Sequence, residues 1–448
     1  MTRKHENTRN PILPLDIHIP DSEAHVMPDG NLYIYGSFDE RNDMYCSEKY
    51  HVISTADMKN WNISDVSFEG KDVPWFNNPD APKYQGIDWS NPTPFIQKML
   101  ANMEHTEEKE NFENFEDKER PPLLFAPDVA YRNGKYYLYF CMPDDSEGVA
   151  VSDSPNGPFT NPIQFPIGGI DPAIFIDDDG QAYYYWGQLF SHGVKMNEDM
   201  ISFDSSQIVD NLVTEEEHFF HEGSSMRKIG DTYYLVYANI EYGKPTSLGY
   251  STSKSPLGPF TYRGVIINNE ECDPASWNNH GSIEYFNNQW YVFYHRCSRG
   301  VQQYRRLCIE PITINQDGSI DEVKMTSQGL GKPFTNSEII YGYQACRLKG
   351  KAYIGLIDDK NEAVVNISNH DEITFRYIES ENGFNNVLIK ANGNAEIDLF
   401  LNNEFISKSN IENGEIKTSK IKVDAGHYEV TLKVNNVKDF ELLEIAFS

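Results

Sequence analysis

The sequence has no long run of apolar residues and no dense framework of cysteines. No window approaches the roughly 18 apolar residues that a membrane-spanning helix needs, and the first segment, MTRKHENTRN, carries charges but no apolar signal-peptide core. The six cysteines stand singly, without a CxxC pair, which favours reduced thiols and argues against structural zinc. We therefore expect a cytoplasmic protein with no membrane partner.

Basic residues are scarce as well. The chain has 38 Lys and Arg against 68 Asp and Glu among 448 residues, which gives a formal net charge of −30. Nucleic acid and anionic membrane surfaces repel such a chain, so we expect no nucleic-acid partner. A neutral or cationic ligand fits this charge better.

Aromatic residues, in contrast, are abundant. Tyr (27), Phe (25) and Trp (6) together make up 13% of the chain. Aromatic faces stack on sugars, but an aromatic-rich β core gives the same composition. The length exceeds that of one ordinary core and predicts two domains, or one large repeat fold with an appendage.

Five segments share a plan, in which a Gly, Asn or Asp turn precedes a short aromatic strand. They are PDGNLYIYGS at 28–37, NGKYYLYF at 133–140, DDGQAYYYWG at 178–187, IGDTYYLVYA at 229–238 and FNNQWYVFYHR at 286–296. Each turn suits a β-hairpin, and each following run suits a strand. From the second copy on, the turns recur every 46 to 57 residues or so, which is the length of a four-stranded blade.

A second repeat supports the first, because SDSPNGPF at 152–159 and SKSPLGPF at 253–260 are near-copies. The longer first interval contains a charged insertion around residues 72–120, which reads as a surface excursion. These periods predict an all-β chain with a five-bladed β-propeller over residues 10–325. From residue 340 to 448, short β runs alternate with Asn/Gly turns and predict a β-sandwich.

A polar residue stands upstream of each hairpin turn. These residues are Asp21, Asp128, Asp171, Glu222 and His280. In a propeller the innermost strand of each blade begins at the central channel, so this register predicts that all five side chains face one cavity. Acidic residues also favour turns at strand edges for local reasons, which is the alternative explanation at any single position.

Several carboxylates facing one pocket bind a hard metal ion or perform general acid–base chemistry. The flanking aromatics favour sugar chemistry. Glycoside hydrolysis uses one protonated carboxylic acid for the leaving oxygen and one ionised carboxylate on the opposite face. Crowding and burial keep the acid protonated near neutral pH, since clustered like charges raise the pKa of one member.

Three segments together resemble glycoside hydrolase family 43. They are IPDSEAHVMPDGNLYIYGS, LFAPDVAYRNGKYYLYF and FFHEGSSMRKIGDTYYLVYA, in that order. The resemblance implies a five-bladed propeller that inverts the anomeric centre and needs no cofactor for its chemistry. It implies Asp21 as general base, Asp128 as the residue that modulates the pKa and orientation of the acid, and Glu222 as general acid.

The first segment departs from the family pattern in one place. The family's first motif reads Asp-Pro, whereas here Ser22 follows Asp21. Asp16, in LPLDIHIPD, is therefore a competing candidate for the base. The register of Asp21 against its hairpin turn favours Asp21.

The resemblance also implies roles for other residues. NNHGSIEYF is similar to the segment whose histidine contacts a central calcium ion, which makes His280 the metal candidate; a channel histidine bonded to water is the alternative. Arg305, in QQYRRLCIEPI, matches an arginine that contacts the sugar, and Arg306 points to the other face of its strand as a surface or structural residue. Asp171 is expected to serve hydrogen bonding or structure. Trp89, in the insertion, is a candidate for stacking on a sugar.

The C-terminal segment is similar to a family 6 carbohydrate-binding module. No tryptophan follows Trp290, so a stacking platform there would need Tyr or Phe. We expect this domain to pack on the propeller and stabilise it rather than bind polysaccharide independently.

The favoured hypothesis is an inverting exo-glycosidase that removes α-L-arabinofuranosyl or β-1,4-D-xylosyl residues, or both, from arabinoxylan- or xylan-derived oligosaccharides. One alternative is a retaining fructosidase-type propeller, which ECDP, with Glu271, resembles faintly. Another is a propeller that binds sugar without cleaving it.

Overall fold

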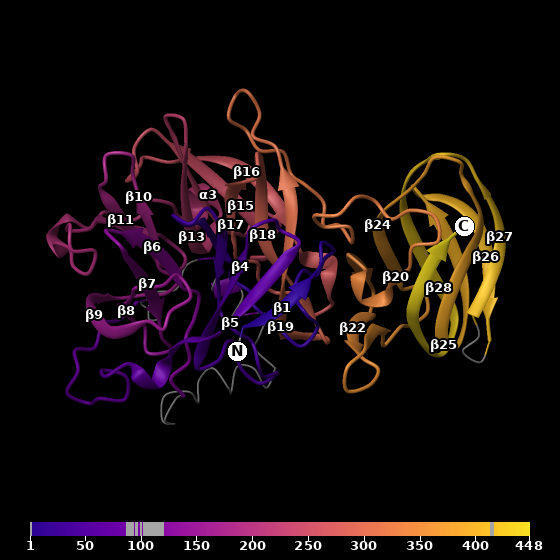
Figure 1. Cartoon of the computed structure of the whole chain (residues 1–448), viewed down its shortest axis with the longest axis horizontal. Helices are drawn as coiled ribbons and strands as arrows, with labels where there is room; N and C mark the ends of the chain where they lie inside the picture. The colour runs from indigo at the N-terminus through magenta and orange to yellow at the C-terminus, as the bar shows by residue number, and fades with distance from the viewer. Residues whose placement is uncertain (1, 87–93, 95–96, 99–100, 102–120, 413–415) are drawn as a thin grey trace.

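The computed structural model describes residues 2–86, 94, 97–98, 101, 121–412 and 416–448. Five antiparallel sheets form the blades of a propeller, and a larger sheet forms a second body beside it (Figure 1). The N-terminus lies in the propeller and the C-terminus in the second body. The predicted all-β class, a five-bladed propeller with a C-terminal sandwich, is confirmed.

The blades follow the chain in order, with the innermost strand first. The first blade contains β2 (Glu23–Val26), β3 (Leu32–Tyr35), β4 (Lys49–Thr55) and β5 (Asn60–Glu69), and β1 (Arg3–Glu6) pairs with β5 as an extra outer strand. The second contains β6 (Asp128–Arg132), β7 (Lys135–Cys141), β8 (Ser146–Ser152) and β9 (Thr160–Gly168). The third contains β10 (Ala173–Ile176), β11 (Ala182–Trp186) and β12 (His192–Lys195).

The last two blades complete the ring. The fourth contains β13 (Phe220–Ile229), β14 (Thr232–Asn239), β15 (Ser247–Ser253) and β16 (Thr261–Asn268), and the fifth contains β17 (Ser282–Phe286), β18 (Gln289–Ser298) and β19 (Val301–Ile312). The five aromatic runs of the sequence are β3, β7, β11, β14 and β18, the second strand of each blade.

Helices are few and short in the described residues. They are η1 (Gly70–Asp72), η3 (Ser205–Gln207), α3 (Glu215–His218), η4 (Glu270–Cys272) and η5 (Gly342–Gln344). The Thr214 hydroxyl caps α3 by accepting from the Glu217 amide, at 3.2 Å. None of the described helices has the length and apolarity to cross a membrane.

Direct contact between the fifth and first blades closes the ring. A parallel bridge pairs Ser22 with Gly281, and the Ser282 hydroxyl donates to the Ser22 carbonyl at 2.9 Å. A Cβ at Gly281 would lie 1.9 Å from the Phe293 carbonyl oxygen, so only glycine permits this approach.

Five apolar clusters fill the spaces between neighbouring blades and explain the aromatic content. Successive side chains of a strand point to opposite faces. Thus Tyr184 of β11 packs between the second and third blades, and Tyr185 packs between the third and fourth. In β14, Leu235 packs against the third blade and Tyr234 against the fifth. The aromatic strands are therefore core elements rather than sugar platforms.

The second body is a sandwich formed from one nearly closed sheet. Its strands are β20 (Ile340–Tyr341), β21 (Arg347–Lys349), β22 (Tyr353–Leu356), β23 (Glu362–Val365), β24 (Glu372–Ser380), β25 (Phe384–Leu401), β26 (Glu404–Ile411), β27 (Ile416–Val423) and β28 (Gly426–Phe447). The two long strands, β25 and β28, pair with each other along most of their length. Register shifts around Gly393, whose φ is +70°, bend this pair so that it contributes to both layers.

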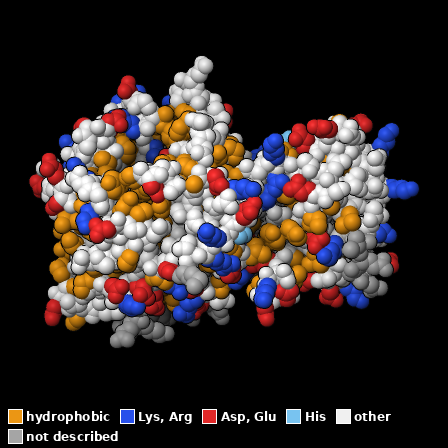
Figure 2. All heavy atoms as spheres, viewed as in Figure 1, with side chains coloured by type: hydrophobic (Ala, Val, Ile, Leu, Met, Phe, Trp, Pro, Cys, Tyr) orange, Lys and Arg blue, Asp and Glu red, His pale blue; other side chains and the backbone are white. Residues whose placement is uncertain are grey.

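The two bodies are in direct contact, although the molecule narrows where they meet (Figure 2). Phe334 forms a parallel bridge with Ile378, and Arg9 pairs with Glu338 at 2.6 Å. The strands of the ring run from Arg3 to Ile312, and those of the sandwich from Ile340 to Phe447. The domain limits 10–325 and 340–448 stay predictions, and so does the likeness of the sandwich to a carbohydrate-binding module.

Candidate active site

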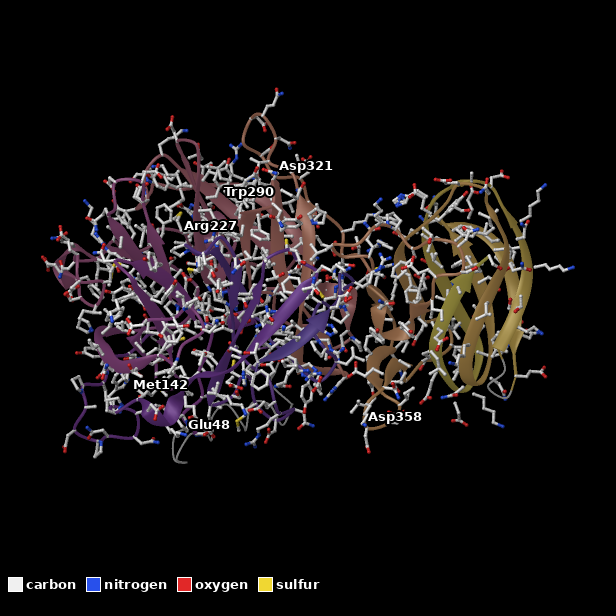
Figure 3. The ribbon with its side chains drawn as sticks, viewed as in Figure 1. Glu48, Met142, Arg227, Trp290, Asp321 and Asp358 are labelled. Atoms are coloured by element: carbon white, nitrogen blue, oxygen red, sulfur yellow. The ribbon has the colours of Figure 1, made fainter. Side chains whose placement is uncertain are left out.

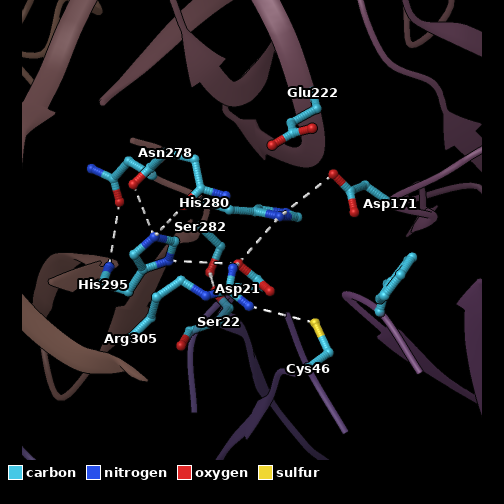
Figure 4. Close-up of polar contacts among 12 residues, drawn as sticks. Asp21, Ser22, Cys46, Asp171, Glu222, Asn278, His280, Ser282, His295 and Arg305 are labelled. Atoms are coloured by element: carbon cyan, nitrogen blue, oxygen red, sulfur yellow. Dashed lines mark hydrogen bonds and ion pairs between the residues drawn. The ribbon is translucent and has the colours of Figure 1, made fainter. Parts of the chain in front are cut away.

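Six polar side chains converge where the inner strands begin (Figure 4). They are Asp21, Asp171, Glu222, His280, His295 and Arg305, each at most 9% exposed. Asp21, Asp171 and His280 each stand two residues before the first residue of β2, β10 and β17. The sequence register thus brings four of its five predicted channel residues together. We call these six residues the upper layer of the channel.

Asp21 lies against the guanidinium of Arg305 and the rings of two histidines. The Arg305 Nη1 atom donates to Asp21 Oδ1 at 2.8 Å, and Nδ1 of His295 and of His280 lie 3.5 and 3.8 Å from the same oxygen. Burial opposes ionisation, but the charge of Arg305 holds the pKa of Asp21 below its usual value. Asp21 is therefore a carboxylate at neutral pH, as a general base must be.

Asp39, which the sequence reasoning missed, fixes Arg305 in place. The Nε and Nη2 atoms of Arg305 donate to the two oxygens of Asp39, both at 3.0 Å, and the Arg305 amide donates to Oδ2 at 2.9 Å. Such a two-armed contact fixes the plane of the guanidinium group. Its remaining arm reaches Asp21.

Asp171 and Glu222 lie on the other side of the His280 ring from Asp21 in Figure 4. Asp171 Oδ2 lies 3.7 Å from His280 Nδ1, and Glu222 Oε2 accepts from Gln188 Nε2 at 2.5 Å. Burial, and then the charges of Glu222 and Asp21, raise the pKa of Asp171 well above its usual value. Asp171 therefore keeps its proton near neutral pH, next to Glu222.

Both histidines of the upper layer are held in the neutral form. Burial, followed by Arg305, lowers the pKa of His295 to about 3, and burial also lowers the pKa of His280. His295 Nε2 lies 3.0 Å from the Asn278 carbonyl oxygen, an acceptor, so Nε2 carries the hydrogen. Nδ1 of His295 is then an acceptor, and it is buried without a hydrogen-bond partner.

Further along the inner strands, a second polar layer connects all five blades. We call it the lower layer, and its residues are Glu23, His25, Asp128, Arg227 and Glu284. Arg227 of β13, which lies inside the propeller in Figure 3, pairs with Glu23 of β2 at 2.7 Å and with Glu284 of β17 at 3.2 Å. His25 Nε2 contacts Asp128 Oδ1 of β6 at 2.7 Å, with Glu23 3.6 Å away. Asp128 Oδ2 accepts from the Ile174 amide of β10 at 2.7 Å.

Glu23, His25 and Asp128 are the group of potential metal ligands in the described residues, with ligand atoms within 4.8 Å of one another. Glu23 Oε1 already accepts from Arg227 and from the Ser225 hydroxyl, and Asp128 accepts from two backbone amides. The adjacent guanidinium supplies the positive charge that a metal would supply. We read the lower layer as a self-satisfied network that fixes the blades together.

Asp128 thus lies in the lower layer, apart from the position expected beside Glu222. It is the first residue of β6, whereas Asp21, Asp171 and His280 precede their strands by two residues. Asp171, expected to have a minor part, faces Glu222 instead.

The structure also separates the other candidates. The Asp16 side chain is 67% exposed and pairs with Arg3 at 2.6 Å, and Glu271 is 43% exposed and pairs with Arg347 of the sandwich. Arg306 points away from the channel as expected, and its burial favours the structural role over the surface one. Trp89 lies outside the described residues.

Comparisons with known proteins identify the class. A family model described as glycosyl hydrolases family 43 matches residues 98–320. A xylosidase/arabinosidase of Thermoclostridium stercorarium is 30% identical over 388 residues, which cover 76% of this chain and 72% of the relative. Xylosidase/arabinosidase 43A of Humicola insolens is 30% identical, with 68% and 96% covered.

Solved structures of family 43 enzymes resemble this one. A β-xylosidase/α-arabinofuranosidase from a compost metagenome, in complex with xylotriose and described as a calcium-free form, is 28% identical with a TM-score of 0.55 over 72% of this chain and 99% of its own. An arabinoxylan arabinofuranohydrolase from Bacillus subtilis, 23% identical with a TM-score of 0.51, shares the fold over 98% of this chain and 97% of its own.

Propeller, buried carboxylates and relatives together define a glycoside hydrolase. The chain belongs to glycosyl hydrolase family 43. Enzymes of this family need no cofactor for the chemical step.

One buried carboxyl behind Asp171 gives a prediction. Glu147 is fully buried, accepts a hydrogen bond from the Tyr184 hydroxyl through Oε2, and has no partner for Oε1. Burial raises the pKa of Glu147 to about 8. Because the folded-state pKa exceeds the unfolded one, the protein loses stability as the pH rises from about 4.5 to about 8, by up to about 1.4 kcal/mol per pH unit.

Glu147→Gln removes this titration. We expect the melting temperature of the variant, relative to the wild type, to increase steadily between pH 5 and pH 8 in thermal unfolding measurements. Glu48→Gln, at an exposed glutamate, is the control and should show no such trend. A constant difference between Glu147→Gln and the wild type across this range would contradict the buried, protonated state.

Proposed function

We propose that this family 43 enzyme is an inverting exo-glycosidase acting on α-L-arabinofuranosyl or β-1,4-D-xylosyl ends, or both, of xylan-derived oligosaccharides. The observation that carries the proposal is the ionised Asp21 on one side of a buried channel and, on the other, Glu222 beside Asp171, whose pKa is raised well above its usual value. Asp21 takes a proton from the attacking water, and Glu222 donates a proton to the leaving oxygen. No part of this step requires a bound cofactor.

For the residue beside the acid, the geometry favours Asp171 over Asp128. Asp171 interacts electrostatically with Glu222, whereas Asp128 is bonded to His25 and to backbone amides in the lower layer. A neighbouring carboxyl helps a general acid to keep its proton through mutual repulsion. We therefore propose Asp171 for the role first expected of Asp128, and a structural role for Asp128.

The names of the relatives support the substrate class, since they include xylosidase/arabinosidase and arabinoxylan arabinofuranohydrolase. The candidate catalytic carboxyls are 9% exposed or less, so a sugar must enter a pocket to reach them, which favours a chain end. Arabinofuranose and xylopyranose present similar hydroxyl arrangements, so one pocket accommodates both. A cytoplasmic location would favour imported oligosaccharides over polymers.

The fructosidase alternative has less support, because Glu271 lies half-exposed in an ion pair with the sandwich. The non-catalytic alternative is tested by substitution. We expect Asp21→Ala and Glu222→Ala to lower kcat/KM on aryl xylosides and arabinofuranosides by about 10²- to 10⁴-fold, the usual range for an acid or base. The loss in Glu222→Ala should be smallest for the most acidic phenol leaving groups, which need no protonation.

The same assay compares the two aspartates. Asp171→Asn should lower kcat more than Asp128→Asn, and Asp128→Asn should mainly lower the melting temperature. Wild-type rates in Glu222→Ala would refute the acid assignment, and absence of wild-type activity on every pentoside would favour a sugar-binding protein.

A calcium ion beside His280 is a further proposal. The imidazole of His280 lies 3.8 and 3.7 Å from carboxylate oxygens of Asp21 and Asp171, and calcium prefers oxygen ligands, so these two carboxylates are the groups that would hold the ion. The ion would supply positive charge near the carboxylates.

Chelator-treated protein should therefore bind about one calcium ion per chain in metal analysis, with a rise in melting temperature that is lost in His280→Ala. The exposed His370→Ala serves as the control and should keep the rise. An identical rise in His280→Ala, or no calcium uptake by the wild type, would contradict the site.

A further inference from the structure

The tip of the β18–β19 hairpin lies at the junction of the two bodies. Strand β18, which pairs with β19, contacts β22 of the sandwich. Successive residues of a strand point to opposite faces. Arg305 reaches Asp21 in the channel, and Arg306 points toward the sandwich.

In the sandwich, the carboxylate of Glu362 forms an ion pair with Arg306. Glu362 is the first residue of β23, and its carboxylate is fully buried. Arg306 Nη2 lies 2.5 and 2.6 Å from its two oxygens, and Arg299 Nη2, from the hairpin tip, lies 3.3 Å from Oε1. Glu362 therefore neutralises two arginines of the propeller at once. The turn that precedes it contains Asp358, which Figure 3 shows at the same junction.

This ion cluster continues by hydrogen bonds to the residue before Arg305. Arg306 Nε donates to the Ser298 hydroxyl at 3.0 Å, and that hydroxyl donates to the Tyr304 carbonyl at 2.8 Å. Tyr304 has a φ of +57°, in the left-handed region that bulky residues rarely occupy. Such a conformation persists only where the surroundings hold it in place.

The sandwich also holds the turn itself. The Arg299 amide donates to the Ile354 carbonyl of β22 at 2.6 Å, and the Arg299 guanidinium lies over the Tyr304 ring, 4.3 Å from its centre. A Cβ at Gly300 would come within 3.1 Å of the Tyr353 ring. The backbone that leads into Arg305 is thus held on one side by contacts with Ile354 of β22 and Glu362 of β23.

We propose that Glu362 of the sandwich is a positioning residue for hydrolysis, acting through Arg306, Ser298 and Tyr304 on Arg305. The C-terminal sandwich then completes the active site of the propeller, in addition to any contact of its own with sugar. This inference rests on the proposed function, in which Asp21 is the general base, because Arg305 contacts Asp21.

The physical reason is the cost of leaving buried charges unpaired. Without the carboxylate of Glu362, the buried guanidinium of Arg306 loses its counterion. Its Nη1 atom already lacks a hydrogen-bond partner, which adds to the cost of burial. The unpaired charge of Arg306 can be solvated only if the β18–β19 hairpin moves toward water. A shift of about 1 Å in a catalytic group lowers a rate by about 10²-fold, so modest movement of Arg305 has a measurable effect.

The test is a double-substitution cycle in the full-length protein, with kcat and kcat/KM on an aryl pentoside as readouts. We expect Glu362→Gln to lower kcat by about tenfold or more, within the effect of a 1 Å displacement. If Glu362 acts through Arg305, the double variant Arg305→Lys, Glu362→Gln should have the kcat of Arg305→Lys alone.

Glu338→Gln is the matched control. It removes another ion pair between the two bodies, Arg9 with Glu338, that does not contact the hairpin. We expect it to keep wild-type kcat, alone and combined with Arg305→Lys. Wild-type kcat in folded Glu362→Gln, or losses that multiply in the double variant, would overturn the inference.

A second variant keeps the test decisive if Glu362→Gln does not fold. If Glu362→Gln shows no cooperative melting, Arg306→Lys replaces it in the same cycle, because lysine keeps the charge and loses the forked contact. The failure of the proposed function looks different, because Asp21→Ala would then retain hydrolysis. If only this inference fails, Asp21→Ala is inactive while Glu362→Gln and Arg306→Lys behave as the wild type.

Discussion

The contact between Arg305 and Asp21 is the interaction on which the rest of the site depends. Burial alone would favour the neutral form of Asp21, and the guanidinium reverses that preference. Asp39 fixes the guanidinium from the opposite side through two hydrogen bonds, so Asp21, the proposed base, is ionised and oriented before substrate arrives. Asp171 carries no comparable cation and keeps its proton instead. One channel therefore holds an ionised carboxylate, Asp21, and a protonated carboxyl, Asp171, and glycoside hydrolysis uses such a combination of an ionised and a protonated group.

The propeller supports this arrangement with two polar layers in its channel and apolar clusters between its blades. The lower layer joins all five blades through Arg227, Glu23, His25 and Asp128. Breaking a buried ion pair of this kind costs about 3–5 kcal/mol, so these contacts specify how the blades meet. The aromatic strands fill the wedges between blades, which removes the need to explain them by sugar binding.

Much of this fold was predictable from local sequence. The turn-plus-aromatic repeat predicts the second strand of every blade, and counting back from each turn predicts four residues of the upper layer. The count fails at Asp128 because this residue stands only five positions before the β6–β7 turn, whereas Glu222 and His280 stand eight and seven positions before turns of the same two-residue length. Asp128 therefore lies further along its inner strand, which the loose spacing of the sequence count ignored. Asp39 and Glu23 escaped prediction because their partners Arg305 and Arg227 lie 266 and 204 residues away.

The stereochemistry of the first product tests the central claim most directly. Asp21 is proposed to activate water rather than attack the sugar, so each turnover should invert the anomeric centre. Proton NMR of early hydrolysis of an aryl β-D-xyloside, or of an aryl α-L-arabinofuranoside, reports the configuration of the sugar before it equilibrates. We predict α-xylose from the first substrate and β-arabinofuranose from the second. First-formed sugar with the configuration of the substrate would contradict the assignment of Asp21 as a general base.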